Sequence, residues 1–340
     1  MAERIHVLVT GGAGYIGSHA VLALIDAGHR VTVIDDLSTG VRAAVPGSVE
    51  LIVGDVGDRA LVGRVLASAR FDTIMHFAGS IVVPESVADP LKYYRNNTAA
   101  SRTLIEAAVA AGVPRFVFSS TAAVYGVPEA IPIGEDAPTR PINPYGWSKL
   151  MTEQILRDTS AATGLRHASL RYFNVAGADP AGRAGQCTPE ATHLIKVAVQ
   201  AAIGKRGHVE VFGDDWPTAD GTGVRDYIHV SDLADAHVAV MALLRRGAAS
   251  ATFNCGYGRG ASVRQVLDAV DRAAGGRIER RHAPRRPGDP PALVADPGRL
   301  MRAVGWTPRH GDLATIVATA VAGARKLAAK AASAAARAHV

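Results

Sequence analysis

The sequence predicts an α/β protein with a doubly wound parallel sheet, followed by a smaller mixed α/β region. Short β-branched runs alternate with helix-spaced apolar segments through the first half of the chain, as they do in parallel β-α-β units. A glycine-rich turn joins the first of these runs to the first helical segment. Of the 340 residues, 48% are hydrophobic and 20% are charged, so the chain has enough apolar side chains for an extensive core.

The expected elements follow in chain order. Residues 5–10 are apolar and β-branched and end at a glycine pair, which predicts a buried strand. Residues 15–27 carry apolar side chains at helical spacing and stop at Gly28, which predicts a helix. By the same patterns, further strands are expected at residues 30–34, 49–53, 73–77, 115–119 and 167–172, and further helices at residues 60–69, 99–111 and 145–163.

Beyond Phe173 this alternation loosens. Gly, Pro and Asp cluster at residues 176–185, 213–223 and 284–291, which indicates loops, and helices are expected near residues 190–202, 232–245 and 263–273. We therefore expect a first domain at residues 1–174 and a smaller region at residues 175–320 that is interleaved with it. Residues 321–340 are rich in Ala, Lys and Arg and are expected to form an exposed helix or tail without chemistry.

Charge and cysteine content argue against several classes of protein. The net charge of +6 at pH 7 suits an anionic ligand, but no basic stripe with interleaved aromatic residues is present, so no nucleic acid partner is expected. Cys187 and Cys255 are too few for a disulfide framework, and no Cys or His spacing is typical of a metal site. No apolar run is long enough for a membrane span and no secretion signal precedes the first strand, so we expect a cytoplasmic location and no membrane contact.

The first strand leads into the sequence GGAGYIG, in which Gly11, Gly14 and Gly17 have G-x-x-G-x-x-G spacing. Glycine lets the backbone approach a pyrophosphate, and the helix that begins there favours the negative charge. Asp35 ends the second strand, where a carboxylate can bind the adenine ribose hydroxyls. Asp36 follows, and no Arg stands beside it to bind a 2′-phosphate, so the predicted cofactor is NAD rather than NADP.

A second constellation lies in the middle of the chain. Tyr145 and Lys149 are four residues apart on a predicted helix and share one face, and Thr121 follows the fifth strand at the ligand-binding edge. A Tyr hydroxyl has a reference pKa of about 10, and a nearby ammonium and an oxidised nicotinamide both favour its phenolate. These residues predict an acid/base pair. The alternative is that Tyr145 only packs within the helix and that Lys149 is only solvated.

Four motifs together resemble the extended short-chain dehydrogenase/reductases, which have a Rossmann-type fold: TGGAGYIG, HFAG, FSSTAAVYG and YGWSK. Three longer segments are similar to the UDP-glucose (UDP-galactose) 4-epimerases of that family: NPYGWSKLMTEQIL, LRYFNVAGADP and VFGDDWPTADGTGVRDYIHVSDLADAH. The resemblance spans about residues 5–310. It implies epimerisation of a UDP-sugar at C4 through a 4-keto intermediate, with NAD as the bound cofactor.

The resemblance also implies roles for single residues. Tyr145 would exchange the proton of the sugar 4-hydroxyl, Lys149 would hold the nicotinamide ribose, and Thr121, where the family usually has Ser, would bind the sugar oxygen. Besides the three glycines, Tyr145 and Lys149, contacts with NAD are implied at Tyr15, Ile16, Asp35, Asp55, Val56, Phe77, Ala78, Gly79, Asn96 and Phe173. Contacts with the UDP-sugar, including Arg at the diphosphate and Phe212 near the uridine, are implied at Thr121, Tyr145, Asn174, His193, Leu194, Phe212, Arg225, Arg286 and Leu293.

Three positions depart from the pattern of some family members. Ile81 replaces a Lys near NAD, His193 replaces an Asn beside the diphosphate, and Leu293 replaces a Tyr that narrows the sugar pocket. A Leu leaves room for an N-acetyl group unless neighbouring side chains fill the space. The sugar therefore stays open between glucose/galactose, the N-acetyl forms and the pentose pair xylose/arabinose.

Two other activities on the same fold are disfavoured. Ala122 and Ala123 follow Thr121 at positions where a nucleotide-sugar 4,6-dehydratase needs an Asp/Glu pair and a UDP-glucuronate decarboxylase needs a Glu. A non-catalytic nucleotide sensor is the alternative from another class, but it has no use for a tyrosinate. The predicted helices at residues 99–111 and 145–163 carry extra apolar stripes, and the resemblance implies that they pair with their copies in a homodimer.

Overall fold

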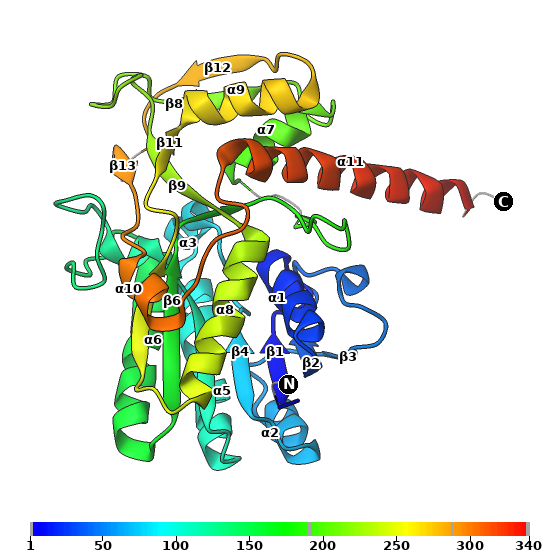
Figure 1. Ribbon diagram of the computed structural model, residues 1–340, viewed down its shortest axis with the longest axis vertical. Coiled ribbons are helices and arrows are strands. Elements are labelled where there is room, and N and C mark those ends of the chain that lie inside the picture. Colours follow the sequence, from blue (N-terminus) through cyan, green and yellow to red (C-terminus); the bar gives the residue numbers. More distant parts are fainter. Residues whose placement is uncertain (1–2, 189–191, 287–288, 338–340) are drawn as a thin grey trace.

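The computed structural model describes residues 3–188, 192–286 and 289–337. Its centre is a seven-stranded parallel sheet in the order β10-β6-β5-β4-β1-β2-β3 (Figure 1). The predicted doubly wound α/β fold is confirmed, and the order reverses between β1 and β4, where such sheets bind ligands. The strands are β1 (His6–Thr10), β2 (Arg30–Asp35), β3 (Glu50–Val53), β4 (Thr73–His76), β5 (Arg115–Thr121), β6 (Arg166–Tyr172) and β10 (Ala251–Cys255).

Helices cover both faces of this sheet, because alternate residues of a strand point to opposite sides. In β1, Val7 and Val9 belong to the buried cluster that contains α1 (Tyr15–Asp26) and α8 (Val230–Arg245). Leu8 belongs to a second buried cluster on the opposite face, formed with α2 (Arg59–Ser68), α5 (Ala100–Ala110) and α6 (Pro144–Thr163). Burial on both faces explains why these strands are apolar without alternation.

A second region stands beyond the carboxyl ends of the large sheet (Figure 1). It contains a four-stranded sheet and a separate two-stranded sheet. Helix α11 packs against α7, α9 and the strands β7 and β9. The strands of the first are β7 (Asn174–Ala176), β9 (Val224–His229), β11 (Gly260–Ser262) and β13 (Ala292–Leu293), and those of the second β8 (Val209–Phe212) and β12 (Arg280–Ala283). The helices are α7 (Leu194–Ala202), α9 (Val263–Ala274), α10 (Gly298–Val304) and α11 (Leu313–Arg337).

The chain passes between the two regions more than once. Both α8 and β10 pack with the large sheet, although they lie within the residues expected to form the smaller region. The expected boundary after residue 174 falls inside β7, and the one after residue 320 falls inside α11. The expected beginning of a helix at residue 190 lies outside the described residues, and α7 is described from Leu194.

The segment before α5 was not predicted. It contains the short helices α3 (Val83–Ala88) and α4 (Pro90–Tyr93), followed by a π-helical segment, η2 (Tyr94–Ala99). A π turn inserts an extra residue into a helix and is frequent at functional sites. The structure also has two 3₁₀ turns, η1 (Arg42–Ala44) and η3 (Ala122–Tyr125), the second directly after β5.

The C-terminal helix α11 begins well before the expected start at residue 321. Ile316, Val317 and Val321 are buried, so the first turns belong to the core of the second region rather than to an exposed tail. Farther along, α11 extends to the side of the molecule (Figure 1). Among the described residues, no helix is both long and apolar enough to cross a membrane.

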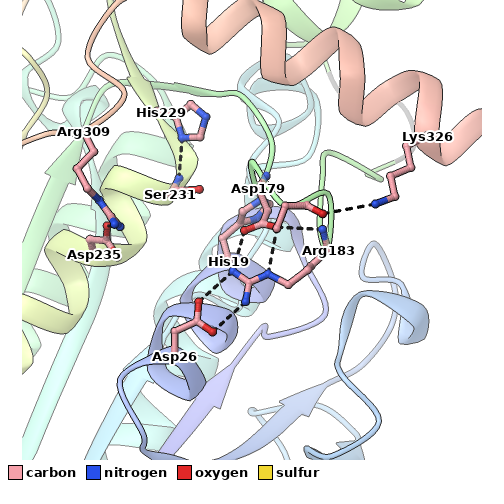
Figure 2. A network of polar contacts seen from close by, with 10 residues as sticks. His19, Asp26, Asp179, Arg183, His229, Ser231, Asp235, Arg309 and Lys326 are labelled. Carbon is pink, nitrogen blue, oxygen red and sulfur yellow. Dashed lines mark hydrogen bonds and ion pairs between the residues drawn. The ribbon is translucent and has the colours of Figure 1, made fainter.

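The turn that follows β7 is held between α1 and α11. Asp179 N donates to His19 Nε2 of α1 at 3.1 Å, and its carboxylate binds Arg183, which also reaches Asp26 at the end of α1 (Figure 2). On the other side, Lys326 of α11 points to this turn (Figure 2). These contacts fix the segment that follows Phe173 and Asn174 against the helix that starts at the glycine turn.

Candidate active site

The glycine turn has the shape that a dinucleotide requires. Gly11 has φ +72°, and a Cβ there would lie 2.5 Å from the backbone nitrogen of Ala78. A Cβ on Gly17 would lie 2.1 Å from the carbonyl oxygen of Gly11. Gly14 caps α1 without a side-chain hydrogen bond, and no acidic residue lies in the first turn of the helix. The helix N-terminus therefore keeps its positive end for an anion, and a pyrophosphate fits this cradle.

Asp35 lies at the end of β2 beside this turn. One carboxylate oxygen accepts from Ala13 N and the other from Leu37 N, each at 2.9 Å. Burial raises the pKa of Asp35, and these backbone hydrogen bonds oppose that effect. The side chain is thus held in one orientation with lone pairs left for ribose hydroxyls, as expected for an NAD site.

Two more strand ends of the large sheet complete this edge. Asp55 follows β3, is exposed, and accepts from Gly57 N at 2.7 Å, while Val56 beside it is buried. Phe77 N and Ala78 N, after β4, both donate to the carbonyl of Thr10 in β1. The predicted cofactor residues that follow four of the strands therefore lie along the carboxyl edge of the large sheet.

Sequence reasoning missed Asn97, which organises the turn after β4. Its side-chain oxygen accepts from Ser80 N at 2.7 Å, and its nitrogen donates to Ser148 Oγ of α6 at 3.0 Å. A Cβ on Gly79 would lie 2.8 Å from the same oxygen and 3.7 Å from Lys149 Nζ. The neighbouring residue Asn96 bonds Ser80 Oγ. The pair Asn96–Asn97, just before the helix expected at residues 99–111, is the signal that could have indicated this site.

The predicted acid/base residues meet at one point. Thr121 ends β5, and its hydroxyl lies close enough to that of Tyr145, in the first turn of α6, to lower the pKa of the tyrosine. One turn later, Lys149 Nζ donates to the carbonyl oxygen of Ser119 at 3.0 Å. Both α6 side chains are nearly inaccessible, with exposed fractions of 7% for Tyr145 and 3% for Lys149. A proton donor, its partner hydroxyl and an ammonium are thus enclosed beside the glycine-rich edge.

Burial governs the ionisation of these groups. It raises the pKa of Tyr145, although the hydrogen bond with Thr121 lowers it. Burial also lowers the pKa of Lys149 to about 8, so its ammonium remains charged at neutral pH. Tyr145 therefore needs a nearby positive charge before it can act as a base, and Lys149 is one turn away on the same helix face.

The predicted nucleotide-sugar residues lie on adjacent strands of the second region. Asn174 of β7 pairs in register with Tyr227 of β9, and Leu293 of β13 pairs with Arg225 of β9. Leu293 also packs against the buried cluster that contains Phe173 and the turn after Thr121. The four-stranded sheet thus carries its predicted ligand residues toward the catalytic edge.

Two arginines of this region lie close to each other. Burial lowers the pKa of Arg225, and the charge of Arg286 lowers it further while Asp289, 3.9 Å away, opposes this. The guanidinium carbon of Arg286 lies 3.7 Å from the ring centroid of Phe212. Two cations that repel each other in a partly buried site suit a ligand with two negative phosphates.

His193 and Leu194 lie where α7 begins. Burial lowers the pKa of His193, and its Nδ1 is a buried atom that has no hydrogen-bond partner within the described part of the chain. A buried polar atom without a partner is costly, so a ligand that offers a hydrogen bond would be favoured there. The place of His193 beside the diphosphate stays a prediction.

The glycine cradle and the enclosed Tyr-Lys-Thr group define the class, which is an NAD-dependent enzyme that works by hydride and proton transfer. Comparison with known proteins agrees. Residues 7–256 match the NAD dependent epimerase/dehydratase family. A UDP-glucose 4-epimerase of Azospirillum brasilense is 61% identical over 94% of this chain and 92% of its own length. The chain therefore belongs to the NAD dependent epimerase/dehydratase family.

Solved structures give the same result for the fold. The UDP-glucose 4-epimerase of Brucella ovis, in complex with NAD, superposes with a TM-score of 0.91 at 43% identity, over 93% of this chain and 97% of that one. The UDP-Glc/GlcNAc 4-epimerase of Campylobacter jejuni superposes with a TM-score of 0.84 at 43% identity, over 95% of this chain and 99% of that one. At this identity the likeness extends beyond a shared architecture.

Proposed function

We propose that this chain interconverts UDP-glucose and UDP-galactose by NAD-dependent epimerisation at C4. The observation that carries the proposal is the enclosed contact of Thr121 with Tyr145, one helical turn from the Lys149 ammonium and beside the glycine-rich edge. Relatives named UDP-glucose 4-epimerase, at 45–61% identity over most of the chain, support the same activity. Neither the pentose-specific nor the non-catalytic alternative has comparable support.

Bound NAD supplies a reversible hydride acceptor for C4 of the sugar. Tyr145 takes the proton of the 4-hydroxyl as C4 is oxidised and returns it after the 4-keto sugar has turned its other face to the cofactor. Thr121 holds the sugar oxygen in line with the Tyr145 hydroxyl. Lys149 stabilises the tyrosinate, because burial alone raises the pKa of Tyr145 and an adjacent ammonium acts in the opposite direction.

The remote part of the substrate supplies the affinity. Arg225 and Arg286 hold the diphosphate with the planar geometry that suits it, and Phe212 packs near the uridine. The sugar itself is held loosely, since it has to rotate between the two hydride transfers. Binding energy from the UDP moiety then keeps the 4-keto sugar in the site while it rotates.

The turn after β5 does not favour a dehydratase or a decarboxylase. Ala122 is buried and Ala123 lies in the same 3₁₀ turn, so neither position offers a carboxyl group for proton transfer at C5 or C6. The test of the proposed activity is incubation with UDP-glucose, UDP-N-acetylglucosamine and UDP-xylose without added NAD, followed by separation of the products. Formation of UDP-galactose supports the proposal, and a purified protein that contains no nicotinamide nucleotide and needs NADP contradicts it.

The proposal extends to a homodimer in the cytoplasm. Helices α5 and α6 lie side by side, and α6 leaves Trp147 and Met151 exposed by 41% and 40%. An apolar groove lies between α6 and the segment formed by η2 and the first turn of α5, and its lining residues are Tyr94, Thr98, Ala99, Arg102, Met151 and Ile155. Pairing of this groove with its copy around a two-fold axis would bury these side chains.

A further inference from the structure

A buried ion pair lies directly behind the candidate catalytic residues. Glu153 follows Lys149 by one turn of α6, so Tyr145, Lys149 and Glu153 form one stripe on the buried face of this helix. Glu153 and its partner Arg171, on β6, are 2% and 3% exposed. Arg171 Nη2 donates to one oxygen of Glu153 at 2.6 Å, and Nε donates to the other at 3.0 Å.

The same carboxylate also reaches β5. Ser120 Oγ, fully buried, donates to Glu153 Oε1 at 2.5 Å. Ser120 pairs in register with Arg171, so the carboxylate of Glu153 is bound to two neighbouring strands at one level of the sheet. On either side of Ser120 stand Ser119, whose carbonyl oxygen accepts from the Lys149 ammonium, and Thr121, whose hydroxyl lowers the pKa of Tyr145.

Arg171 binds the element beyond Thr121 as well. Its Nη1 donates to the hydroxyl of Tyr125 at 3.0 Å, and Tyr125 is the last residue of the turn η3 that begins after Thr121. Tyr125 in turn donates to Asn254 Oδ1 of β10 at 2.7 Å. The ion pair thus fixes the strand before Thr121 and the turn after it.

We propose that Glu153 and Arg171, acting through Ser120, are positioning residues that set Tyr145 and Lys149 in register with Thr121 and Ser119. Apolar packing alone allows a helix to shift along a sheet or to rotate about its axis. The hydrogen bonds of Ser120 and Arg171 to Glu153 fix the position of α6 along the strands. A buried ion pair adds little net stability over apolar side chains of the same volume, because desolvation offsets the attraction. Here the ion pair fixes the position of α6 relative to β5, and a proton transfer between Tyr145 and a sugar oxygen requires such a fixed position.

This inference rests on the proposed epimerase activity, so wild-type turnover of UDP-glucose is measured in parallel. Ser120→Ala removes the hydroxyl bound by Glu153 and leaves the ion pair in place. We expect kcat to fall about ten- to a hundredfold, the size of effect that a small misplacement of reacting groups produces. The KM for UDP-glucose and the content of bound NAD should stay near the wild-type values, since Ser120 is fully buried and is not one of the proposed binding residues.

Ser169→Ala is the matched control. Ser169 is also a fully buried serine, on β6, and its hydroxyl has no hydrogen-bond partner among the described residues. It should keep wild-type kcat. A second variant, Glu153→Leu combined with Arg171→Met, replaces the pair with apolar side chains, which proteins often tolerate without loss of stability. It should keep its Tm and bound NAD but lose kcat to a similar extent.

The outcomes separate the two claims. An inactive wild-type protein would contradict the proposed function and the inference together. Active wild type with full kcat in Ser120→Ala would contradict the inference alone. A fall in kcat that is accompanied by equal losses of Tm and bound NAD would also contradict it, because it would indicate a general structural role. If the double variant does not fold, Ser120→Ala decides.

Discussion

The guanidinium of Arg286 stacks on the ring of Phe212, with its central carbon 3.7 Å from the ring centroid. The residue proposed to bind the diphosphate thus contacts the residue proposed to pack near the uridine. The neighbouring Arg285 stacks in the same way on Trp216, at 4.2 Å, and also bonds Asp215. One loop therefore presents two consecutive arginines, each on an aromatic ring, of which one is proposed to meet the ligand.

Arg286→Lys should weaken UDP binding. A lysine keeps the charge but loses the planar fork and the stacking on Phe212, so we expect KM for UDP-glucose to rise about tenfold, or ~1.4 kcal/mol, with kcat little changed. Steady-state kinetics and calorimetry with UDP measure both effects. Arg285→Lys is the matched control and should bind UDP as the wild type does. Equal effects of the two substitutions would remove Arg286 from the diphosphate site.

Tyr145→Phe should abolish most of the turnover. The loss of a general acid/base typically lowers kcat by about 10²–10⁴, and UDP binding should persist because the proposed UDP-binding residues lie in the second region. Thr121→Ser keeps the hydroxyl and should be mild, whereas Thr121→Val should be severe. Kinetics with UDP-glucose provide the measurement, and near-normal turnover of Tyr145→Phe would exclude the proposed role.

Lys149→Met should stabilise the protein while it inactivates the site. Burial lowers the pKa of Lys149 from 10.5 to about 8, so between these values the unfolded chain binds a proton that the folded chain lacks. The contribution of Lys149 to the free energy of unfolding therefore increases with pH in that window. Below the window, the buried ammonium costs on the order of 3 kcal/mol, which its hydrogen bond to Ser119 partly offsets.

The measurement is urea unfolding of NAD-free protein across this pH range. The advantage of Lys149→Met over the wild type should be largest near neutral pH and should shrink as the pH rises from about 8 toward 10.5. Lys205→Met, at an exposed lysine, is the control. A constant difference between wild type and Lys149→Met at every pH would show that the ammonium is not the cause.

Leu293→Tyr should narrow the range of sugars. Leu293 pairs with Arg225 and packs beside Phe173, so it lies between the proposed diphosphate site and the catalytic edge. We expect the wild type to convert UDP-N-acetylglucosamine as well as UDP-glucose, and the variant to lose the N-acetyl substrate preferentially, by about 1–3 kcal/mol in kcat/KM. If both substrates are affected equally, Leu293 serves packing and does not select the sugar.

The purified protein should be a dimer through α5 and α6. Light scattering should give twice the chain mass of 35.4 kDa, and Met151→Glu, which places a charge in the apolar groove, should give the single-chain mass. Exposed Val127, on the loop after η3, provides a control for the effect of a new surface charge: Val127→Glu should leave the dimer intact. A wild-type protein that scatters as a single chain would rule out the proposed assembly.

Local patterns in the sequence were sufficient for most of the large sheet and for the stripe of Tyr145 and Lys149. Each depends on neighbours within one strand or one helical turn, and such signals are visible in a single sequence. The place of β10 in the large sheet was not predicted, because its partner β6 lies far away along the chain. The role of Asn97 was missed for a related reason, since the π-helical segment that turns it toward Ser148 has no periodicity of its own.

The segment VRDYIHVSDLADAH resembles the UDP-glucose 4-epimerases, but the resemblance does not explain its two buried carboxylates. Asp226 is fully buried and accepts from the backbone nitrogens of Tyr257, Gly258 and Ala295. Asp232 is also buried and accepts from the Tyr257 hydroxyl at 2.6 Å. These carboxylates tie β9 and α8 to two loops that are distant in the sequence, at Tyr257–Gly258 and at Ala295, and this role becomes visible only in the folded structure.

The position of β10 beside β6 also governs how the protein can be made. Residues 251–255 form the outer strand of a sheet whose other six strands are complete by residue 172. While the ribosome synthesises the segment between them, β6 is an unpaired edge, and the apolar face that α8 covers remains open to water. During this interval six strands of the nascent chain can pair, but the edge of β6 and one apolar face of the sheet stay exposed. A chaperone that binds exposed apolar surface would act mainly in this interval.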